Sequence, residues 1–297
     1  QQVAVYRTYC DLLQIQPHEV KSIRDIPFLP IEFFKKLTVI SSEKKPETIF
    51  TSSGTTGSIN SKHLVADLSL YRESFLRGFK NFYGEPSQLV ILALLPSYLE
   101  REGSSLVYMV DQLIKETNNP HSGFYLNDLD TLAEKLVALD GADKKVLLLG
   151  VSYALLDLIE QRTFQLKNTS VMETGGMKGR RQEMIKEALH ESLKAGYGVD
   201  TIHSEYGMTE LLSQAYSKGG GLFTCPPWMR VLTRDTEDPF TLVNGTTGGI
   251  NVIDLANLYS CSFIATQDLG KIDADESFEI LGRFDTSDIR GCNLMVL

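Results

Sequence analysis

The sequence predicts an α/β fold that continues into a smaller β-rich part. Between residues 68 and 206, short apolar runs alternate with segments in which apolar residues recur at helical spacing. After the three glycines at 219–221 this alternation stops, and short β-prone runs follow with few helices between them. The chain has 297 residues, which is long for one compact unit. We therefore expect an α/β core over residues 1–218 and a β-rich continuation of the same domain over residues 219–297.

Residues 1–47 are predicted to be mainly helical, with turns at Pro27, Pro30 and Pro46. A short helix is expected after Pro30, because proline suits the first turn of a helix. Short strands are expected at 39–40 and 48–50. The glycine-rich segment after residue 50 therefore begins at the end of a strand.

The core is predicted from a long helix at 68–83 onward. The run at 89–95 is continuously apolar and ends at Pro96, which is typical of a buried parallel strand. Further helices are expected at about 103–116, 127–139, 152–162 and 179–195, with strands at 145–150, 170–173 and 200–206. Strands at 229–234, 249–255 and 278–281 are expected in the β-rich part. This pattern places ligand-binding loops at the carboxyl ends of parallel strands.

Composition excludes several classes of function. The net charge of −9 argues against non-specific binding to nucleic acid or to an anionic membrane, because both need a positive surface. No apolar run approaches the roughly 20 residues that a membrane span needs. The cysteines Cys10, Cys225, Cys261 and Cys292 form no CxxC motif, so reduced thiols in a cytoplasmic protein are expected.

A loop rich in glycine and hydroxyl residues is the first candidate site. Its members are Thr51, Ser52, Ser53, Gly54, Thr55, Thr56 and Gly57. Glycine lets backbone N–H groups turn toward one point and the hydroxyls add donors, so the loop suits phosphate oxygens. It is not a Walker A loop, because no Gly-Lys-Ser/Thr follows Gly57. On composition alone, an ordinary polar turn explains it equally well.

The second candidate site lies within residues 203–210. The ring of Tyr206, next to Gly207, can lie against a purine, while Thr209 offers a hydroxyl and Glu210 a carboxylate. A carboxylate beside a triphosphate is suited to Mg²⁺. The simpler alternative is a strand end followed by an N-capped helix whose dipole Glu210 stabilises.

Two further motifs complete the set. Gly175 and Gly176 follow the strand at 170–173 and allow a flat ligand to approach the backbone, with Lys178 and Arg180 nearby. Asp268, in a Thr-Gln-Asp-Leu-Gly stretch, can accept both hydroxyls of a ribose, and Arg283 can donate to the same sugar. Taken singly, these charged residues are equally well explained as solvated surface groups.

The four motifs, in this order, resemble those of the adenylate-forming superfamily. The closest resemblance is to the acyl-protein synthetases of bacterial bioluminescence fatty-acid reductase systems. It is carried by the motifs above together with residues 61–65, 95–101 and 104–106 and the ending Arg290-Gly291-Cys292. The resemblance implies the large N-terminal domain of that fold, with stacked sheets flanked by helices and a β-barrel-like part. Because only twelve residues follow Asp285, the mobile C-terminal lid domain of the superfamily is expected to be absent.

The resemblance also implies a mechanism in which a carboxylate, expected to be a fatty acid, attacks the α-phosphorus of MgATP. Loop 51–57 would then hold the leaving phosphates, and Gly175 and Gly176 would line the adenine pocket. Tyr206 would stack on the base, Thr209 would contact the α-phosphate, and Glu210 would bind Mg²⁺. Ribose would be held by Asp268 and Arg283. Walls of the acid pocket are expected from Tyr98, Arg101, Ser104, Ser105, Met109 and His203.

In the acyl-protein branch, the acyl group passes to a cysteine near the C-terminus and then to a partner reductase. This implies that Cys292 is the acyl acceptor, with Arg290 nearby to favour its thiolate. Without the resemblance, Cys292 is better explained as a small apolar residue of a terminal strand. Two alternatives stay open: an aryl- or fatty-acyl-CoA ligase similar to phenylacetate-CoA ligases, and a non-catalytic acyl- or nucleotide-binding subunit of a reductase complex.

Overall fold

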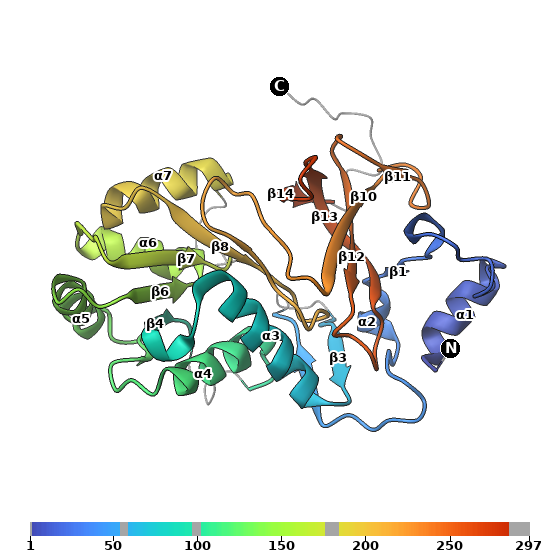
Figure 1. Ribbon diagram of the computed structural model, residues 1–297, viewed down its shortest axis with the longest axis horizontal. Helices are drawn as coiled ribbons and strands as arrows, with labels where there is room; N and C mark the ends of the chain where they lie inside the picture. Colours follow the sequence, from blue (N-terminus) through green and yellow to red (C-terminus); the bar gives the residue numbers. More distant parts are fainter. Residues whose placement is uncertain (1, 54–58, 97–101, 176–183, 285–297) are drawn as a thin grey trace.

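The structure, a computed structural model, describes residues 2–53, 59–96, 102–175 and 184–284. Figure 1 shows two lobes, one with a parallel sheet between helices and one built around a second sheet beside the N-terminal helix. The predicted α/β fold is confirmed. The division of the chain at residue 218 remains a prediction; the edge strand of the second sheet is contributed by the N-terminal segment.

The sheet of the α/β lobe has six strands in the order β5-β4-β6-β7-β8-β9. Their bounds are β4 Val90–Leu94, β5 Gly123–Phe124, β6 Val146–Gly150, β7 Thr169–Glu173, β8 Ile202–Tyr206 and β9 Ala215–Ser217. All neighbours are parallel except β9, which is antiparallel to β8. The carboxyl ends of β7 and β8 therefore lie side by side, at the edge where ligand loops are expected.

Helices cover both faces of this sheet (Figure 1). They are α3 Leu68–Tyr83, α4 Ser105–Thr117, α5 Leu129–Gly141, α6 Ser152–Gln161 and α7 Lys186–Tyr197. Their positions agree with prediction except that α7 begins at Lys186, so residues 184 and 185, which the prediction placed in this helix, precede it. A short 3-10 helix at Pro86–Gln88 leads into β4.

Alternate residues of the central strands face two separate cores. Leu92 and Leu148 pack with α5, α6 and α7, whereas Ile91 and Leu147 pack with α3 and α4. Each such side chain stabilises the fold by about 1.5–3 kcal/mol relative to its exposed state. Burial on both faces is why these strands are continuously apolar.

The second sheet is curled and mainly antiparallel, in the order β1-β13-β12-β10-β11 with β14 paired to β13. Its strands are β1 Leu29–Pro30, β10 Met229–Arg234, β11 Leu242–Val243, β12 Gly248–Asp254, β13 Phe263–Ile272 and β14 Phe278–Arg283. Only β1 runs parallel to its neighbour. The sequence did not predict β13, although it is ten residues long and joins β1, β12 and β14.

The N-terminal segment is less helical than predicted. It contains α1 Ala4–Leu12, a 3-10 turn at Ile23–Asp25 and the short α2 Phe33–Lys36. The strand predicted at 39–40 is not formed, although Val39 is fully buried. A two-stranded hairpin, β2 Thr48–Thr51 and β3 Lys62–Val65, follows and leads into α3. Within the described residues, no helix is both long and apolar enough to cross a bilayer.

Candidate active site

The hairpin of β2 and β3 supports the phosphate-loop candidate. Thr51 pairs with Lys62 at its end, and its N–H donates to the Gly103 carbonyl at 2.8 Å. Beyond the last pair, the Ser52 N–H donates to the Ser61 carbonyl at 3.1 Å, and the Ser61 N–H donates to the Ser52 hydroxyl at 2.9 Å. The base of the loop is thus closed by two hydrogen bonds. Residues Gly54, Thr55, Thr56 and Gly57 lie outside the described residues.

Thr209 and Glu210 lie next to this base. They follow β8 by three and four residues, and His63 of β3 contacts the Thr209 carbonyl through Nδ1 at 2.8 Å. Glu210 is 5% exposed, and the Ser61 hydroxyl hydrogen-bonds its carboxylate. Burial raises the pKa of the Glu210 carboxyl, and Ser61 partly offsets this. Two segments that are more than 140 residues apart in the sequence therefore meet at this base.

Tyr206, Asp268 and Arg283 form one connected cluster. Asp268 and Arg283 are paired across β13 and β14, with Arg283 Nε 3.3 Å from Asp268 Oδ1. The Tyr206 hydroxyl donates to Asp268 Oδ2 at 2.8 Å. Asp268 is only 9% exposed, whereas the Arg283 side chain is more than half exposed. The cluster places a carboxylate, which accepts hydrogen bonds, beside a guanidinium, which donates them, and a hydroxyl group can bond to either.

The ring of Tyr206 is partly enclosed by other aromatic rings. Its centroid lies 5.8 Å from that of Phe223 and 5.5 Å from that of Phe278. The stacking of Tyr206 on a base, implied by the resemblance, remains a prediction.

Gly175 and Gly207 have different structural reasons to be glycine. Gly175 has φ +71°, and within the described part of the chain a Cβ there would meet no atom within 4 Å. At Gly207, a Cβ would lie 2.3 Å from Glu205 Oε1. The lack of a side chain at Gly175 leaves space beside the backbone, and at Gly207 it lets the Glu205 carboxyl group pack against the backbone. Gly176, with Lys178 and Arg180, lies outside the described residues.

A buried carboxylate at the end of β7 was missed by the sequence analysis. Glu173 Oε2 accepts from the Gly175 N–H at 2.7 Å and from the Ser152 hydroxyl at 3.3 Å. His190 of α7 lies 3.5 Å from Oε1. Burial raises the pKa of Glu173, but His190 and the charge of Lys186 outweigh it, so the pKa is lowered overall. These hydrogen bonds hold the turn at Gly175 in place. In the sequence, the only indication of this site was a single glutamate at the end of an apolar strand.

Glu205 is a second carboxyl group that the sequence analysis missed, although it lies inside the 203–210 motif. Burial, and then the charge of Glu173, raise its pKa to about 8. When Glu205 is ionised, above this pKa, its charge adds to burial in raising the pKa values of Tyr71, Tyr83 and Tyr216, which are all at least partly buried. At neutral pH, Glu205 is therefore protonated and can donate a hydrogen bond.

The candidate acid-pocket residues that are described lie around the same aromatic core. Ser105 accepts from the Tyr71 hydroxyl through its carbonyl at 3.0 Å, and Met109 packs in that core. His203 Nδ1 lies 3.1 Å from the Tyr83 hydroxyl. Ser104 instead caps α4, accepting from Val107 N–H at 3.4 Å. Tyr98 and Arg101 lie outside the described residues.

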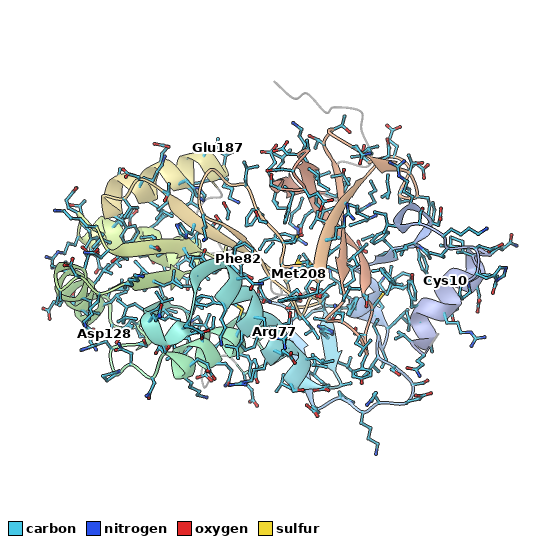
Figure 2. All side chains as sticks on the ribbon, viewed as in Figure 1. Cys10, Arg77, Phe82, Asp128, Glu187 and Met208 are labelled. Atoms are coloured by element: carbon cyan, nitrogen blue, oxygen red, sulfur yellow. The ribbon has the colours of Figure 1, made fainter. Side chains whose placement is uncertain are left out.

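The two lobes meet near the segment that follows β8. Met208, in that segment, lies between the α/β lobe and the second sheet (Figure 2). Across the described ranges, no group of three or more His, Cys, Asp or Glu side chains is arranged to hold a metal ion. Glu210 is thus a single carboxylate, and any Mg²⁺ at it needs ligands from elsewhere, such as phosphate oxygens.

A family model described as "Acyl-protein synthetase, LuxE" matches residues 1–297. No curated protein matched the sequence. Among solved structures, the chain is similar to ATP-bound MatB from Rhodopseudomonas palustris, with a TM-score of 0.59 and 19% identity over 79% of this chain and 47% of that one.

Two other solved structures are similar. A long-chain-fatty-acid-CoA ligase from Archaeoglobus fulgidus has a TM-score of 0.57 and 15% identity, over 79% of this chain and 51% of that one. A 2-hydroxyisobutyryl-CoA ligase has a TM-score of 0.69 and 13% identity, over 96% and 71%. The chain spans about half the length of the first two. These likenesses establish the adenylate-forming fold, and the match over the whole sequence shows that the chain belongs to the acyl-protein synthetase, LuxE, family.

Proposed function

We propose that this protein activates a carboxylic acid with MgATP. An oxygen of the substrate carboxylate attacks the α-phosphorus, the bond between the α- and β-phosphates breaks, and pyrophosphate leaves an acyl-adenylate behind. One observation carries the proposal: Thr209 and Glu210 lie against the base of the phosphate loop, three and four residues after Tyr206, which is bonded to Asp268.

Each motif has a role in this reaction. Loop 51–57 binds the departing phosphates, and Thr209 contacts the α-phosphate. Asp268 and Arg283 bind the ribose, while the open backbone at Gly175 accommodates the adenine. These groups position the reactants and stabilise charge that develops on the phosphates.

Glu210 fits the binding of Mg²⁺. In nucleotide sites this ion is held by one or two carboxylates together with phosphate oxygens, so one buried carboxylate is sufficient. Burial raises the pKa of Glu210, and a bound cation favours its ionised form. The ion would supply charge neutralisation on the phosphates, and Ser61 would orient the carboxylate toward it.

The proposed acid is a fatty acid, and the proposed acceptor is the thiol of Cys292. The thiolate attacks the acyl carbonyl and AMP leaves, which gives a thioester for delivery to a partner reductase. Cys292 lies outside the described residues, but the other three cysteines support the assignment. Burial raises the pKa of all three, to about 12 for Cys225 and Cys261, so their thiols stay protonated at neutral pH.

The first experiment measures pyrophosphate release from MgATP with carboxylic acids of increasing chain length. We expect release that depends on the acid and falls at least about 100-fold in Glu210→Ala. Glu237→Ala, on an exposed turn, is the matched control and should retain the wild-type rate. No release with any acid, in the presence or absence of a reductase, would contradict the proposal.

The second experiment tests the acceptor. With radiolabelled fatty acid and ATP, the wild type should acquire a label that hydroxylamine removes, and Cys292→Ser should not. Cys10→Ser, at a half-buried thiol, is the control that keeps the label. If Cys292→Ser is labelled as fully as the wild type, the acceptor is not Cys292. Formation of acyl-CoA when coenzyme A is added would favour the alternative CoA-ligase activity.

A further inference from the structure

His63 is a fully buried side chain that contacts the active-site segment from the strand after the phosphate loop. It is 0% exposed, and its Nδ1 lies 2.8 Å from the Thr209 carbonyl oxygen, 146 positions away in the chain. A carbonyl oxygen can only accept a hydrogen bond, so Nδ1 must carry the proton. His63 is therefore the Nδ1–H tautomer, and its Nε2 is an unprotonated acceptor.

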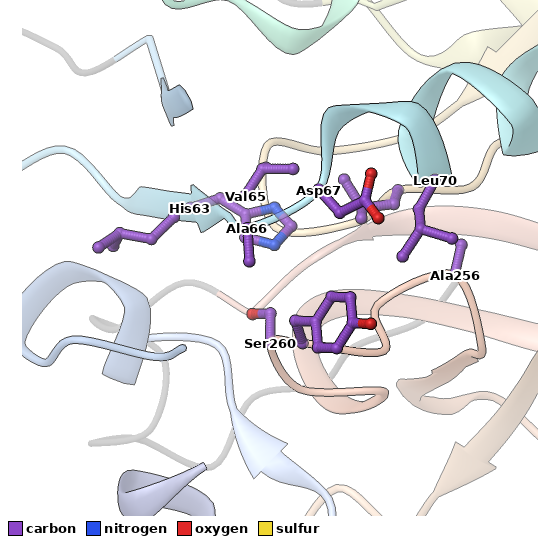
Figure 3. A pocket seen from close by; sticks show the side chains of 10 residues that line it. His63, Val65, Ala66, Asp67, Leu70, Ala256 and Ser260 are labelled. Atoms are coloured by element: carbon purple, nitrogen blue, oxygen red, sulfur yellow. The ribbon is translucent and has the colours of Figure 1, made fainter. Parts of the chain in front are cut away.

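The second ring nitrogen of His63, Nε2, has no hydrogen-bond partner among the described residues, and the atom is buried. His63 lines a small, largely apolar cavity under the hairpin, with Val65, Ala66 and Leu70 on one side and Ala256 and Ser260 on the other (Figure 3). A buried, unpaired acceptor costs about 1–3 kcal/mol. For stability alone, an apolar side chain would be better at this position, as at Val65 on the same face of β3.

Ser61, which is in the same hairpin as His63, hydrogen-bonds Glu210, the residue that follows Thr209. Ser61 and His63 are two positions apart, so both point to one face of the hairpin, and both are buried. His63 binds the backbone of Thr209, and the Ser61 hydroxyl hydrogen-bonds the side chain of Glu210. Ser61 also closes the base of the phosphate loop with Ser52.

The segment is held from the opposite side as well. Asn257, in the turn between β12 and β13, donates from Nδ2 to the Glu210 carbonyl at 2.8 Å. The carbonyl groups of Thr209 and Glu210, which are consecutive, are thus bound by one side chain from the hairpin and one from the turn between β12 and β13. Loss of the His63 contact should therefore shift Thr209, while Asn257 still holds the carbonyl of Glu210 in place.

We propose that His63 is a positioning residue for adenylation: by fixing the Thr209 carbonyl, it couples the phosphate-loop hairpin to the segment that carries Thr209 and Glu210. The inference rests on the proposed function of that segment. A displacement of about 1 Å in a group that contacts the reacting phosphate lowers the rate by about 100-fold. Loss of the His63 contact should therefore lower kcat, while the KM for MgATP, set by many other contacts, changes little.

Three substitutions separate this role from simple packing. In His63→Asn, the side-chain N–H₂ occupies nearly the position of Nδ1 and can still donate to Thr209. In His63→Gln, the donor lies one bond further out, near the position of Nε2. In His63→Leu, the volume is kept and the donor is lost. We expect kcat for pyrophosphate release within about threefold of wild type for Asn, and a loss of about 10- to 100-fold for Gln and Leu.

The outcomes are distinct. Wild-type kcat in His63→Leu would overturn the inference, and so would an equal loss in all three variants accompanied by an equal fall in Tm, since that describes packing alone. If the wild type itself releases no pyrophosphate with any acid, the proposed function fails, and the inference about its chemistry fails with it.

An NMR measurement tests the geometry without requiring any activity. Histidine labelled with ¹⁵N in the full-length chain should show, for the signal that disappears in His63→Asn, a protonated Nδ1 and an unprotonated Nε2 at neutral pH. A protonated Nε2 would exclude the bond to Thr209 and overturn the inference even in an active enzyme.

Discussion

The burial of His63 also predicts how folding stability depends on pH. Burial lowers the pKa of His63 from 6.5 to about 4, partly offset by its bond to Thr209. In the unfolded chain the imidazole takes up a proton as the pH falls below about 6.5, whereas in the folded chain it stays neutral down to about 4. Stability that is present above pH 6.5 is therefore lost as the pH falls toward 4, because the unfolded state binds more protons.

The size of the effect follows from the two pKa values. For one group with pKa 6.5 unfolded and about 4 folded, the loss between pH 8 and pH 5 is about 2 kcal/mol, and the full loss below pH 4 is about 3 kcal/mol. His63→Asn carries no titrating group at this position. Between pH 8 and pH 5, the free energy of unfolding of the wild type should thus fall by about 2 kcal/mol more than that of the variant.

Urea unfolding at the two pH values measures this difference. The chain has a single tryptophan, Trp228, whose indole N–H donates to the Ser74 hydroxyl of α3 at 2.9 Å. Its fluorescence reports on the contact between α3 and the segment before β10. Other buried groups titrate in both proteins, so only the difference between wild type and variant is interpreted.

Equal losses in the wild type and in His63→Asn would refute this account of His63. That result would mean that the folded protein protonates His63 as readily as the unfolded chain does, which is incompatible with a buried ring bonded only through Nδ1.

Three further predictions concern the neighbouring groups. Because burial and Glu173 raise the pKa of Glu205 to about 8, its contribution to stability is present below pH 4.5 and lost as the pH rises to 8; Glu205→Gln should remove this loss in urea unfolding. A Cβ at Gly207 would lie 2.3 Å from Glu205 Oε1, so Gly207→Ala displaces that carboxyl group and should lower kcat by at least about tenfold. At Gly175, a Cβ would meet no atom of the described residues within 4 Å, so Gly175→Ala should cost only about 1 kcal/mol of stability in a melting experiment, from backbone strain at its positive φ. Tyr206→Phe removes the hydrogen bond that the Tyr206 hydroxyl donates to the Asp268 carboxylate at 2.8 Å, and urea unfolding should show a loss of about 1.5–3 kcal/mol of stability, as for hydrogen bonds to charged groups.

The α/β lobe was predictable because its strands have a strong local signal. β4 and β6 are buried on both faces, so nearly every residue in them is apolar. The helices around them show one apolar face each. These patterns are set by immediate neighbours in the chain and need no knowledge of the remaining fold.

β13 was missed because its buried positions are not apolar. Its burial alternates strictly, as in an ordinary strand with one buried face, but the buried positions include Thr266, Asp268 and Gly270. Hydrophobic periodicity therefore falls below detection over the ten residues of the strand. The same residues bind Tyr206 and allow the close approach of β14, since a Cβ at Gly270 would lie 2.3 Å from the Glu279 carbonyl oxygen.

The residues of the candidate site also fall into two groups, those that the sequence predicted and those that only the structure revealed. Thr209, Glu210, Asp268 and Arg283 were predicted because each belongs to a short motif, and the structure brings the first two to the phosphate loop and the last two together with Tyr206. His63, Glu173 and Glu205 were not predicted as site residues, because their role depends on partners far away in the sequence. Only the folded chain places His63 beside Thr209.

Two of these missed residues, Glu173 and His63, share one property: each is polar at a buried position where the fold favours an apolar side chain. Glu173 ends a strand that is otherwise buried and apolar, and His63 lies on the buried face of β3 next to Val65. Burying such groups costs free energy unless each finds a partner. Their partners here are the turn at Gly175 and the carbonyl of Thr209, both parts of the proposed nucleotide site. The departures from the core pattern thus coincide with the segments that would contact ATP, as expected when stability is given up for the placement of reacting groups.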